Sequence, residues 1–325
     1  MIMLAVGLAF LPGAAKEQPK VKRASTDWFR QAGWGVFTHY LTGEDMSATE
    51  WNALVDGFDV PGLARQLKQT GCRYYYLTLG QNSGHYCSPN AAYDRIVGIT
   101  PSKCSRRDLV ADLYDALHPL GIRLMVYLPA GAPDRDPVAM ERLQWSKGAA
   151  RNAEFQRNWE AVIREWSQRW GKKVGGWWFD GCYWPDAMYR FPAPPNFQSF
   201  AAAAKAGNPQ ALVAFNPGVL RPIISLSEYE DYTAGEIDHS GDDPFPPCPG
   251  RWVEGAQWHM LSYLGSNWCR GDKPAYPDDL IVRVTRDRLA AGGVVTWDVP
   301  IDRQGHIPQP FVDQLSALGR ALPGK

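Results

Sequence analysis

Short runs of β-branched, aromatic and aliphatic residues recur along the chain, and each ends in glycine, proline or a polar residue. Runs of this length and composition are typical of buried strands. The segments between the early runs are longer and carry apolar residues at helical spacing. The pattern predicts eight strands, at residues 33–40, 72–80, 123–129, 174–181, 211–218, 230–236, 256–263 and 292–300.

Three helices are predicted between the first strands, at residues 61–71, 105–121 and 150–171, and Gly71 and Gly121 stand where a glycine typically ends a helix. Alternating strands and helices indicate a parallel sheet, and about eight such units in some 300 residues favour a closed barrel. An open doubly wound sheet is the structural alternative, but no Gly-x-Gly-x-x-Gly follows the first strand. We therefore expect an α/β fold, a (β/α)8-like TIM barrel, as a single domain over residues 21–325.

Residues 1–20 read as an apolar run followed by Pro-Gly-Ala-Ala and a charged stretch. This order resembles the apolar core and cleavage site of a signal peptide, although the usual positive residues at its start are missing. The run is too short for a comfortable membrane span, and no later segment is long and apolar enough for one. We therefore expect a secreted or periplasmic protein with no membrane partner.

Aromatic residues are unusually frequent, with 14 tryptophans and 14 tyrosines, and many stand where a strand runs into a loop. Aromatic faces in a concave site are suited to pack against the apolar faces of sugar rings. Trp51, Trp178, Trp258 and Trp297 are candidates for such contacts, and core packing is the alternative for each. The formal net charge is zero and no basic run occurs, which argues against a nucleic-acid partner.

The six cysteines are an even number, which is compatible with disulfides in an exported protein. The pairings to test first are Cys87 with Cys104 and Cys248 with Cys269. His39 and His85 could be metal ligands, but no third ligand falls at zinc spacing and no His-Glu-x-x-His motif occurs. We expect neither a metal nor another cofactor, and no pattern specifies an oligomeric state.

The fourth predicted strand ends in Trp-Trp-Phe-Asp-Gly at residues 177–181, which places Asp180 at its C-terminal end. Active sites of α/β barrels lie at that end of the strands. Retaining glycosidases need a carboxylate there as nucleophile, together with a second carboxyl group as acid/base. The alternative interpretation is that Asp180 caps the turn that follows.

Seven segments resemble, in order, those of the α-L-fucosidase family, glycoside hydrolase family 29. Trp-Gly-Val-Phe-Thr-His-Tyr resembles the first strand of that family, and Trp-Phe-Asp-Gly matches its nucleophile motif. The resemblance implies a barrel that hydrolyses α-L-fucosides with Asp180 as nucleophile and Glu236 as acid/base, Glu254 being the alternative. It also places His39, Glu50 and Tyr127 against the sugar. The seven segments are residues 34–40, 50–51, 103–129, 177–181, 230–236, 251–268 and 292–308.

Two segments depart from the family. After the second strand the family carries His-His-Asp-Gly-Phe, whereas this chain reads Gln81-Asn82-Ser83-Gly84-His85, and Asn216-Pro217-Gly218 lacks an arginine that usually follows strand five. Gln81, Asn82 and His85 remain candidate sugar contacts, since Gln and Asn also bond hydroxyls, but a changed donor set selects a different sugar.

The sequence thus predicts a retaining, exo-acting, α-L-fucosidase-like glycoside hydrolase with a carbohydrate substrate. The alternatives are a non-catalytic carbohydrate-binding barrel, and a glycosidase or lyase of different sugar specificity on the same scaffold.

Overall fold

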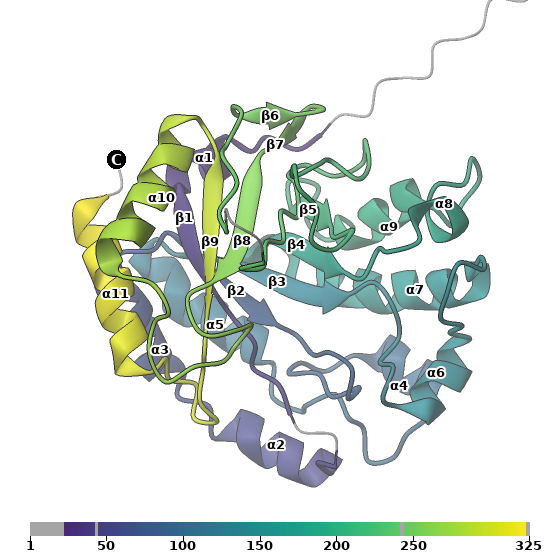
Figure 1. The fold of residues 1–325 in the computed structure, drawn as a ribbon. Helices are drawn as coiled ribbons and strands as arrows, with labels where there is room; N and C mark the ends of the chain where they lie inside the picture. Colours follow the sequence, from purple (N-terminus) through teal and green to yellow (C-terminus); the bar gives the residue numbers. More distant parts are fainter. Residues whose placement is uncertain (1–22, 43–44, 241–243, 323–325) are drawn as a thin grey trace, which may run out of the picture.

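The computed structural model describes residues 23–42, 45–240 and 244–322, and the predicted leader at residues 1–20 lies outside these ranges. The described residues form one curled parallel sheet with helices packed around its outer face (Figure 1). This arrangement confirms the predicted α/β fold and its barrel-like architecture. No helix in the described part is long and apolar enough to cross a lipid bilayer.

The sheet contains seven strands, and every hydrogen-bonded pair of neighbours runs parallel. The order β5-β4-β3-β2-β1-β9-β8 places the first and last strands of the chain side by side. A small antiparallel hairpin, β6 (Trp252–Val253) with β7 (Ala256–Gln257), leads into β8. The bounds of the seven strands are β1 Trp34–Thr38, β2 Tyr74–Thr78, β3 Arg123–Pro129, β4 Val174–Asp180, β5 Leu212–Phe215, β8 His259–Tyr263 and β9 Val294–Val299.

The three predicted helices correspond to α3, α5 with the short 3-10 helix that follows it, and α7. Asp59 accepts a hydrogen bond from the Gly62 N–H at the start of α3, and Gly71, at a φ of +79°, ends that helix. The bounds are α1 Asp27–Ala32, α2 Ala48–Asp56, α3 Val60–Thr70, α4 Ala91–Val97, α5 Leu109–Leu117, η1 His118–Leu120, α6 Pro137–Leu143, α7 Ala153–Trp170, η2 Gly171–Lys173, α8 Pro185–Met188, α9 Phe197–Ala204, α10 Asp278–Ala290 and α11 Gln309–Ala321.

The sixth predicted strand, residues 230–236, lies between β5 and β8 but does not form a regular strand. Parallel bridges join Tyr232 to Gln257 and Glu236 to Leu261, so the segment follows the direction of the sheet. Its sheet-like bonds therefore carry Glu236 to the same end of the barrel as the C-terminal ends of the neighbouring strands.

Two buried carboxyl groups attach this segment to β5. Glu230 accepts a hydrogen bond from the Phe215 N–H at 3.2 Å, and Asp231 accepts one from the Val213 N–H at 2.9 Å. The Lys205 ammonium lies 2.6 Å from Asp231 and compensates its buried charge. Side-chain oxygens thus replace part of the backbone ladder, which explains why the closing segment is irregular.

Side chains alternate between the barrel interior and the layer beneath the helices, because strand residues have a period of two. In β9 the Trp297 indole N–H donates to the Thr285 hydroxyl of α10, while the next residue, Asp298, bonds His39 within the barrel opening. Much of the aromatic content therefore fills the fold. The interior cluster includes Phe37, Tyr74, Tyr76, Tyr127, Trp178 and Tyr232.

Candidate active site

Asp180 is the last residue of β4 and stands half-buried where the strand enters its loop. One carboxylate oxygen accepts hydrogen bonds from the Gly181 N–H and the Asn216 side-chain amide, both at 2.8 Å. The other oxygen accepts a 2.6 Å bond from the Tyr127 hydroxyl. Three donors directed at one carboxylate hold it in a single orientation.

Glu236 lies next to Asp180, and Asn216 connects the two. The Asn216 side-chain nitrogen donates to Asp180 at 2.8 Å and to Glu236 at 2.6 Å. The two bonded carboxylate oxygens are therefore no farther apart than the sum of these distances. Carboxyl groups lie about 5–5.5 Å apart in retaining glycosidases and roughly 6.5–9.5 Å apart in inverting ones, so this upper bound on one oxygen pair favours the shorter arrangement.

The environment of Glu236 favours its protonated form. Burial of the carboxyl group, followed by the negative charge of Asp180, raises the pKa of Glu236 to about 7. The hydrogen bond from Asn216 acts in the opposite direction and lowers this pKa. A pair with one carboxylate held by donors and one carboxyl group of raised pKa is the combination that acid/base catalysis with a nucleophile requires.

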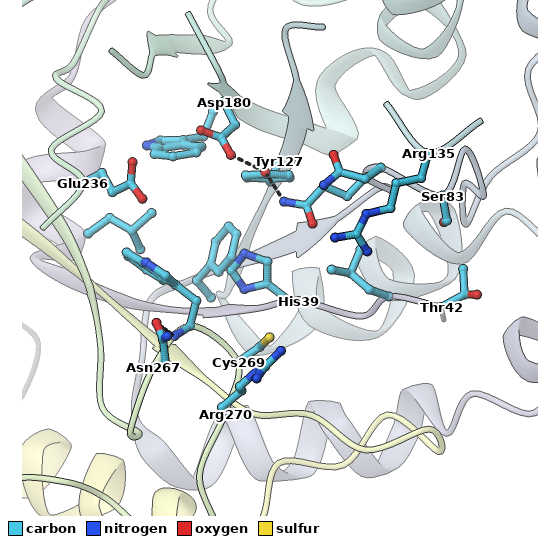
Figure 2. A pocket seen from close by; sticks show the side chains of 17 residues that line it. His39, Thr42, Ser83, Tyr127, Arg135, Asp180, Glu236, Asn267, Cys269 and Arg270 are labelled. Carbon is cyan, nitrogen blue, oxygen red and sulfur yellow. Dashed lines mark hydrogen bonds between the residues drawn. The ribbon is translucent and has the colours of Figure 1, made fainter. Parts of the chain in front are cut away.

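A cavity of about 470 Å³ opens in front of the two carboxyl groups. Figure 2 shows Asp180, Glu236, Tyr127 and His39 directed toward this common space, with Arg135 at its edge. The lining residues come from the C-terminal ends of several strands and from the loops that follow them, as expected for a barrel enzyme. The remaining lining residues are Phe37, Leu41, Thr42, Gln81, Asn82, Ser83, Trp178, Leu261, Asn267, Trp268, Cys269 and Arg270.

Gln81, Tyr127 and Asp180 form a hydrogen-bonded chain along one wall. The Gln81 amide donates to the Tyr127 hydroxyl at 2.6 Å, and that hydroxyl donates to Asp180. The Trp178 ring stacks on Tyr127 with ring centres 5.4 Å apart, and its indole N–H donates to the Ala234 carbonyl. Trp178 is therefore held rigidly and is a largely covered part of the cavity lining.

His39 is oriented by Asp298, which sequence patterns did not indicate. The His39 Nδ1 lies 2.8 Å from Asp298, and the other Asp298 oxygen accepts a bond from the Cys269 N–H at 2.6 Å. Burial raises the pKa of Asp298, and the nearby His39 opposes this effect. In the neutral tautomer that directs Nδ1–H at the carboxylate, Nε2 of His39 is a hydrogen-bond acceptor.

Glu50, Trp51 and His85 do not line the cavity, and each has a structural contact instead. Glu50 is exposed and completes the capping box of α2 by accepting a bond from the Ser47 N–H. The Trp51 indole N–H donates to the Tyr86 carbonyl at 2.9 Å. His85 packs edge-on to Trp51, and burial lowers its pKa to about 4, so its ring is neutral near pH 7.

Glu254, Trp258 and Trp297 require a correction of the sequence-based assignment. Glu254 lies in the β6–β7 hairpin, just before β8 begins and thus at the opposite end of the strands from Asp180 (Figure 1). Trp258 and Trp297 are buried in the outer core, because their positions along the strands direct them away from the barrel interior. Of the two candidate carboxyl groups, Glu236 is the one that lies beside Asp180.

The important residues that were not predicted are Asn216, Asp298 and the basic pair Arg135 and Arg270. Asn216 and Asp298 both lie near the C-terminal ends of predicted strands, and this position is a sequence signal for a site residue in a barrel. Arg135 and Arg270 come from loops, where no periodic pattern indicates which side chain faces a cavity.

All six cysteines carry free thiols, so neither expected disulfide is present. Cys248 contacts the Gly250 carbonyl near the start of β9, whereas Cys269 lies beside Asp298 near its end. Cys87 is buried and its thiol is directed at the Thr78 carbonyl. Within residues 23–42, 45–240 and 244–322, no group of three or more His, Cys, Asp and Glu side chains is arranged to hold a metal ion.

Comparison with protein families gives one match, in which the model of the α-L-fucosidase family covers residues 45–324. No curated protein sequence matches the chain.

Comparison with solved structures gives similar folds at low sequence identity. An endo-fucoidan hydrolase of glycoside hydrolase family 107 is 20% identical with a TM-score of 0.70, over 90% of this chain and 53% of that one. A family 29 α-L-fucosidase from Bacteroides thetaiotaomicron is 18% identical with a TM-score of 0.60, over 96% of this chain and 76% of that one. An α-L-fucosidase from Paenibacillus thiaminolyticus is 17% identical with a TM-score of 0.59, over 91% of this chain and 74% of that one. The chain spans 53% and 63% of the first two fucoidan hydrolases that it matches.

Proposed function

The chain belongs to the α-L-fucosidase family, a family of glycoside hydrolases, and we propose that it is a retaining enzyme that releases a terminal α-L-fucose from a glycan or polysaccharide. The observation that carries this proposal is the single Asn216 nitrogen that bonds both Asp180 and Glu236. It supports the carboxyl spacing of a double displacement, in which no water molecule has to fit between the nucleophile and the sugar.

In the first step, an ionised Asp180 attacks the anomeric carbon of the bound sugar. The bond from this carbon to the glycosidic oxygen breaks while Glu236 gives its proton to that oxygen. A covalent ester between the sugar and Asp180 results, and the alcohol of the leaving group departs. The hydrogen bonds from Tyr127, Asn216 and the Gly181 N–H position Asp180 for this attack.

In the second step, Glu236, now ionised, takes a proton from a water molecule, and the water oxygen attacks the anomeric carbon. The ester bond to Asp180 breaks, the free sugar retains its anomeric configuration, and Glu236 is protonated again. A pKa of about 7 suits a group that must first give and then accept a proton near neutral pH. Burial and the charge of Asp180 supply this value without a cofactor.

Sugar recognition is assigned to the polar groups that face the same cavity. His39, oriented by Asp298, offers an acceptor at Nε2, and Gln81 and Asn82 offer amide groups in place of the histidines of the family. Trp178 is largely covered and adds a small apolar part to the cavity wall. Fucose is proposed from family membership, and the amide pair is the feature through which the selected sugar could differ.

We also propose that the protein is secreted or periplasmic, which residues 1–20 support.

The test is hydrolysis of a panel of 4-nitrophenyl α- and β-glycosides by the wild type, by Asp180→Asn and by a control variant. Asp115→Asn is a matched control, because Asp115 is a surface residue whose charge pairs with Lys173. We expect hydrolysis of the α-L-fucoside by the wild type and Asp115→Asn, and loss of turnover in Asp180→Asn. Nuclear magnetic resonance of the sugar first released then shows whether its anomeric configuration is retained or inverted.

The alternatives give different results. Hydrolysis of another glycoside keeps the mechanism and changes the sugar, and release of the inverted anomer refutes the double displacement. An unsaturated, ultraviolet-absorbing product indicates a lyase. If the protein binds a glycan without turnover, and Asp180→Asn binds it equally well, the protein is a carbohydrate-binding protein.

A further inference from the structure

A cavity of about 630 Å³ lies at the end of the barrel opposite to the candidate active site. It opens where β3 and β4 begin, between α1, α5 and the short helix η2. Gly175, which lines it, precedes Asp180 by five residues in β4, so their Cα atoms are about 17 Å apart at roughly 3.3 Å per strand residue. We call it the basal cavity, and its volume suits an organic ligand rather than a single ion.

Three cations line the basal cavity, and no Asp or Glu is among its described lining residues. The cations are Arg123, the first residue of β3, and Lys172 and Lys173 of η2. Asp115 lies 3.0 Å from Lys173, whereas neither Arg123 nor Lys172 forms an ion pair within the described part of the chain. The cavity is therefore electropositive, and an anionic ligand is complementary to it.

Aromatic rings hold two of these cations in place. The Arg123 guanidinium lies over the Trp28 indole, 4.4 Å from the ring centre, and the Lys173 ammonium lies 5.2 Å from the centre of the Tyr114 ring. Partial burial lowers the pKa of Arg123. The guanidinium has five N–H donors in a planar fork, which matches two oxygens of one oxyanion such as a sulfate or a carboxylate.

The rest of the lining favours a saccharide over a flat aromatic ligand. The exposed Gln210 adds an amide that can bond hydroxyl groups. Faces of the two rings are already used, by Arg123 on Trp28 and by His118, which stacks on Tyr114 with ring centres 4.9 Å apart. A nucleotide base would therefore find less aromatic surface for stacking than nucleic-acid sites usually offer.

We propose that the basal cavity is a second carbohydrate-binding site that holds an anionic oligosaccharide, with Arg123 and Lys172 bonded to its sulfate or carboxylate groups. The anionic character follows from the cavity itself, whereas the choice of a saccharide rests on the proposed function. Because Asp180 is at the other end of β4, this site takes no part in bond cleavage. It anchors a charged polysaccharide and so raises the local concentration of its ends near the active site.

The test is isothermal titration calorimetry at low salt with four probes: isomaltotetraose, its sulfated form, tetragalacturonate and a thymidylate tetramer. Arg123→Gln/Lys172→Gln removes two charges from the cavity, and Arg283→Gln/Arg286→Gln removes two exposed charges from α10 as the matched control. We expect the wild type and the control to bind one charged saccharide equally, and the cavity variant to bind it about 10-fold more weakly. The tighter of the two charged saccharides identifies the recognised group as sulfate or carboxylate.

Two further measurements separate the site from general effects. Lys172→Gln alone should also weaken binding, without disturbing the packing of Arg123 on Trp28. Hydrolysis of the aryl α-L-fucoside should be unchanged in all these variants, since none of the altered residues lines the active-site cavity.

Equal weakening in both double variants indicates general charge attraction and overturns the site. Binding of the neutral tetrasaccharide as tightly as the charged ones overturns it as well, and so does the absence of binding by the wild type. If the thymidylate tetramer binds more tightly than either charged saccharide, and Arg123→Gln/Lys172→Gln loses that binding, the cavity is a nucleotide site instead. The proposed function fails separately, when the wild type hydrolyses no glycoside.

Discussion

Removing the amide that joins the two carboxyl groups should shift the alkaline limit of activity upward. Asn216 is buried, and its side-chain nitrogen donates to both Asp180 and Glu236. Its bond to Glu236 stabilises the ionised carboxylate and so lowers the pKa of that group. In Asn216→Ala the bond is lost, and the protonated acid required in the first step persists to higher pH.

The size of the shift follows from the energy of one hydrogen bond to a charged group. Such a bond contributes about 1.5–3 kcal/mol. One pKa unit corresponds to about 1.36 kcal/mol, so the pKa should rise by about 1–2 units, and by less where water replaces the lost donor. Starting from about 7, the pKa of Glu236 should move toward 8 or 9.

The assay is the pH dependence of kcat/KM for the aryl glycoside cleaved best, which reports ionisations of the free enzyme. The wild type should lose activity as pH rises through about 7, and Asn216→Ala should lose it at higher pH with a lower maximum. Asn208→Ala is the control, because the Asn208 amide is also buried but donates to the Val174 carbonyl at the start of β4. An alkaline limb that stays in place, or moves to lower pH, would refute Glu236 as the acid bonded by Asn216.

Three further predictions follow from single contacts. Tyr127→Phe removes the 2.6 Å bond to Asp180 and should lower kcat/KM about 10- to 100-fold without a matching loss of thermal stability. Glu236→Ala should lower turnover of substrates with poor leaving groups about 10²- to 10⁴-fold, and added azide should restore turnover of activated aryl glycosides as a glycosyl azide of retained configuration. Burial raises the pKa of Glu230 from 4.5 to about 8, so the folded chain holds a proton that the unfolded chain releases. The stability contributed by this proton should therefore be fully present below about pH 4.5 and lost by about pH 8, as measured by unfolding in urea. In Glu230→Gln the free energy of unfolding should no longer show this pH dependence.

Each of these predictions has a result that contradicts it. Equal kcat/KM in the wild type and Tyr127→Phe would show that the Tyr127 bond does not support Asp180. Absence of azide rescue, or a glycosyl azide of inverted configuration, would remove Glu236 from the proposed role. Identical pH profiles of unfolding in the wild type and Glu230→Gln would show that Glu230 does not hold a proton in the folded state.

Much of the fold was predictable because it depends on local patterns. The strand at residues 123–129 corresponds to β3 without a change of bounds, and the helix at 150–171 contains α7. The sixth strand was placed correctly in the barrel, but its irregular form was not predicted. Its closure depends on the buried carboxyl groups of Glu230 and Asp231, whose oxygens accept hydrogen bonds from backbone N–H groups of β5.

The sequence by itself predicted that Asp180 ends a barrel strand, because a carboxylate at that position is visible in the order of residues, and the structure places it there on the cavity. Only the tertiary structure separated Glu236 from Glu254. Glu236 lines the cavity at the C-terminal ends of the strands, whereas Glu254 lies in the β6–β7 hairpin at the other end. The tertiary structure also determined which tryptophans are buried beneath the helices and which line the cavity, because this depends on contacts between segments that are distant in sequence. The joint hydrogen bonding of Asp180 and Glu236 by Asn216 likewise exists only when three strand ends are brought together.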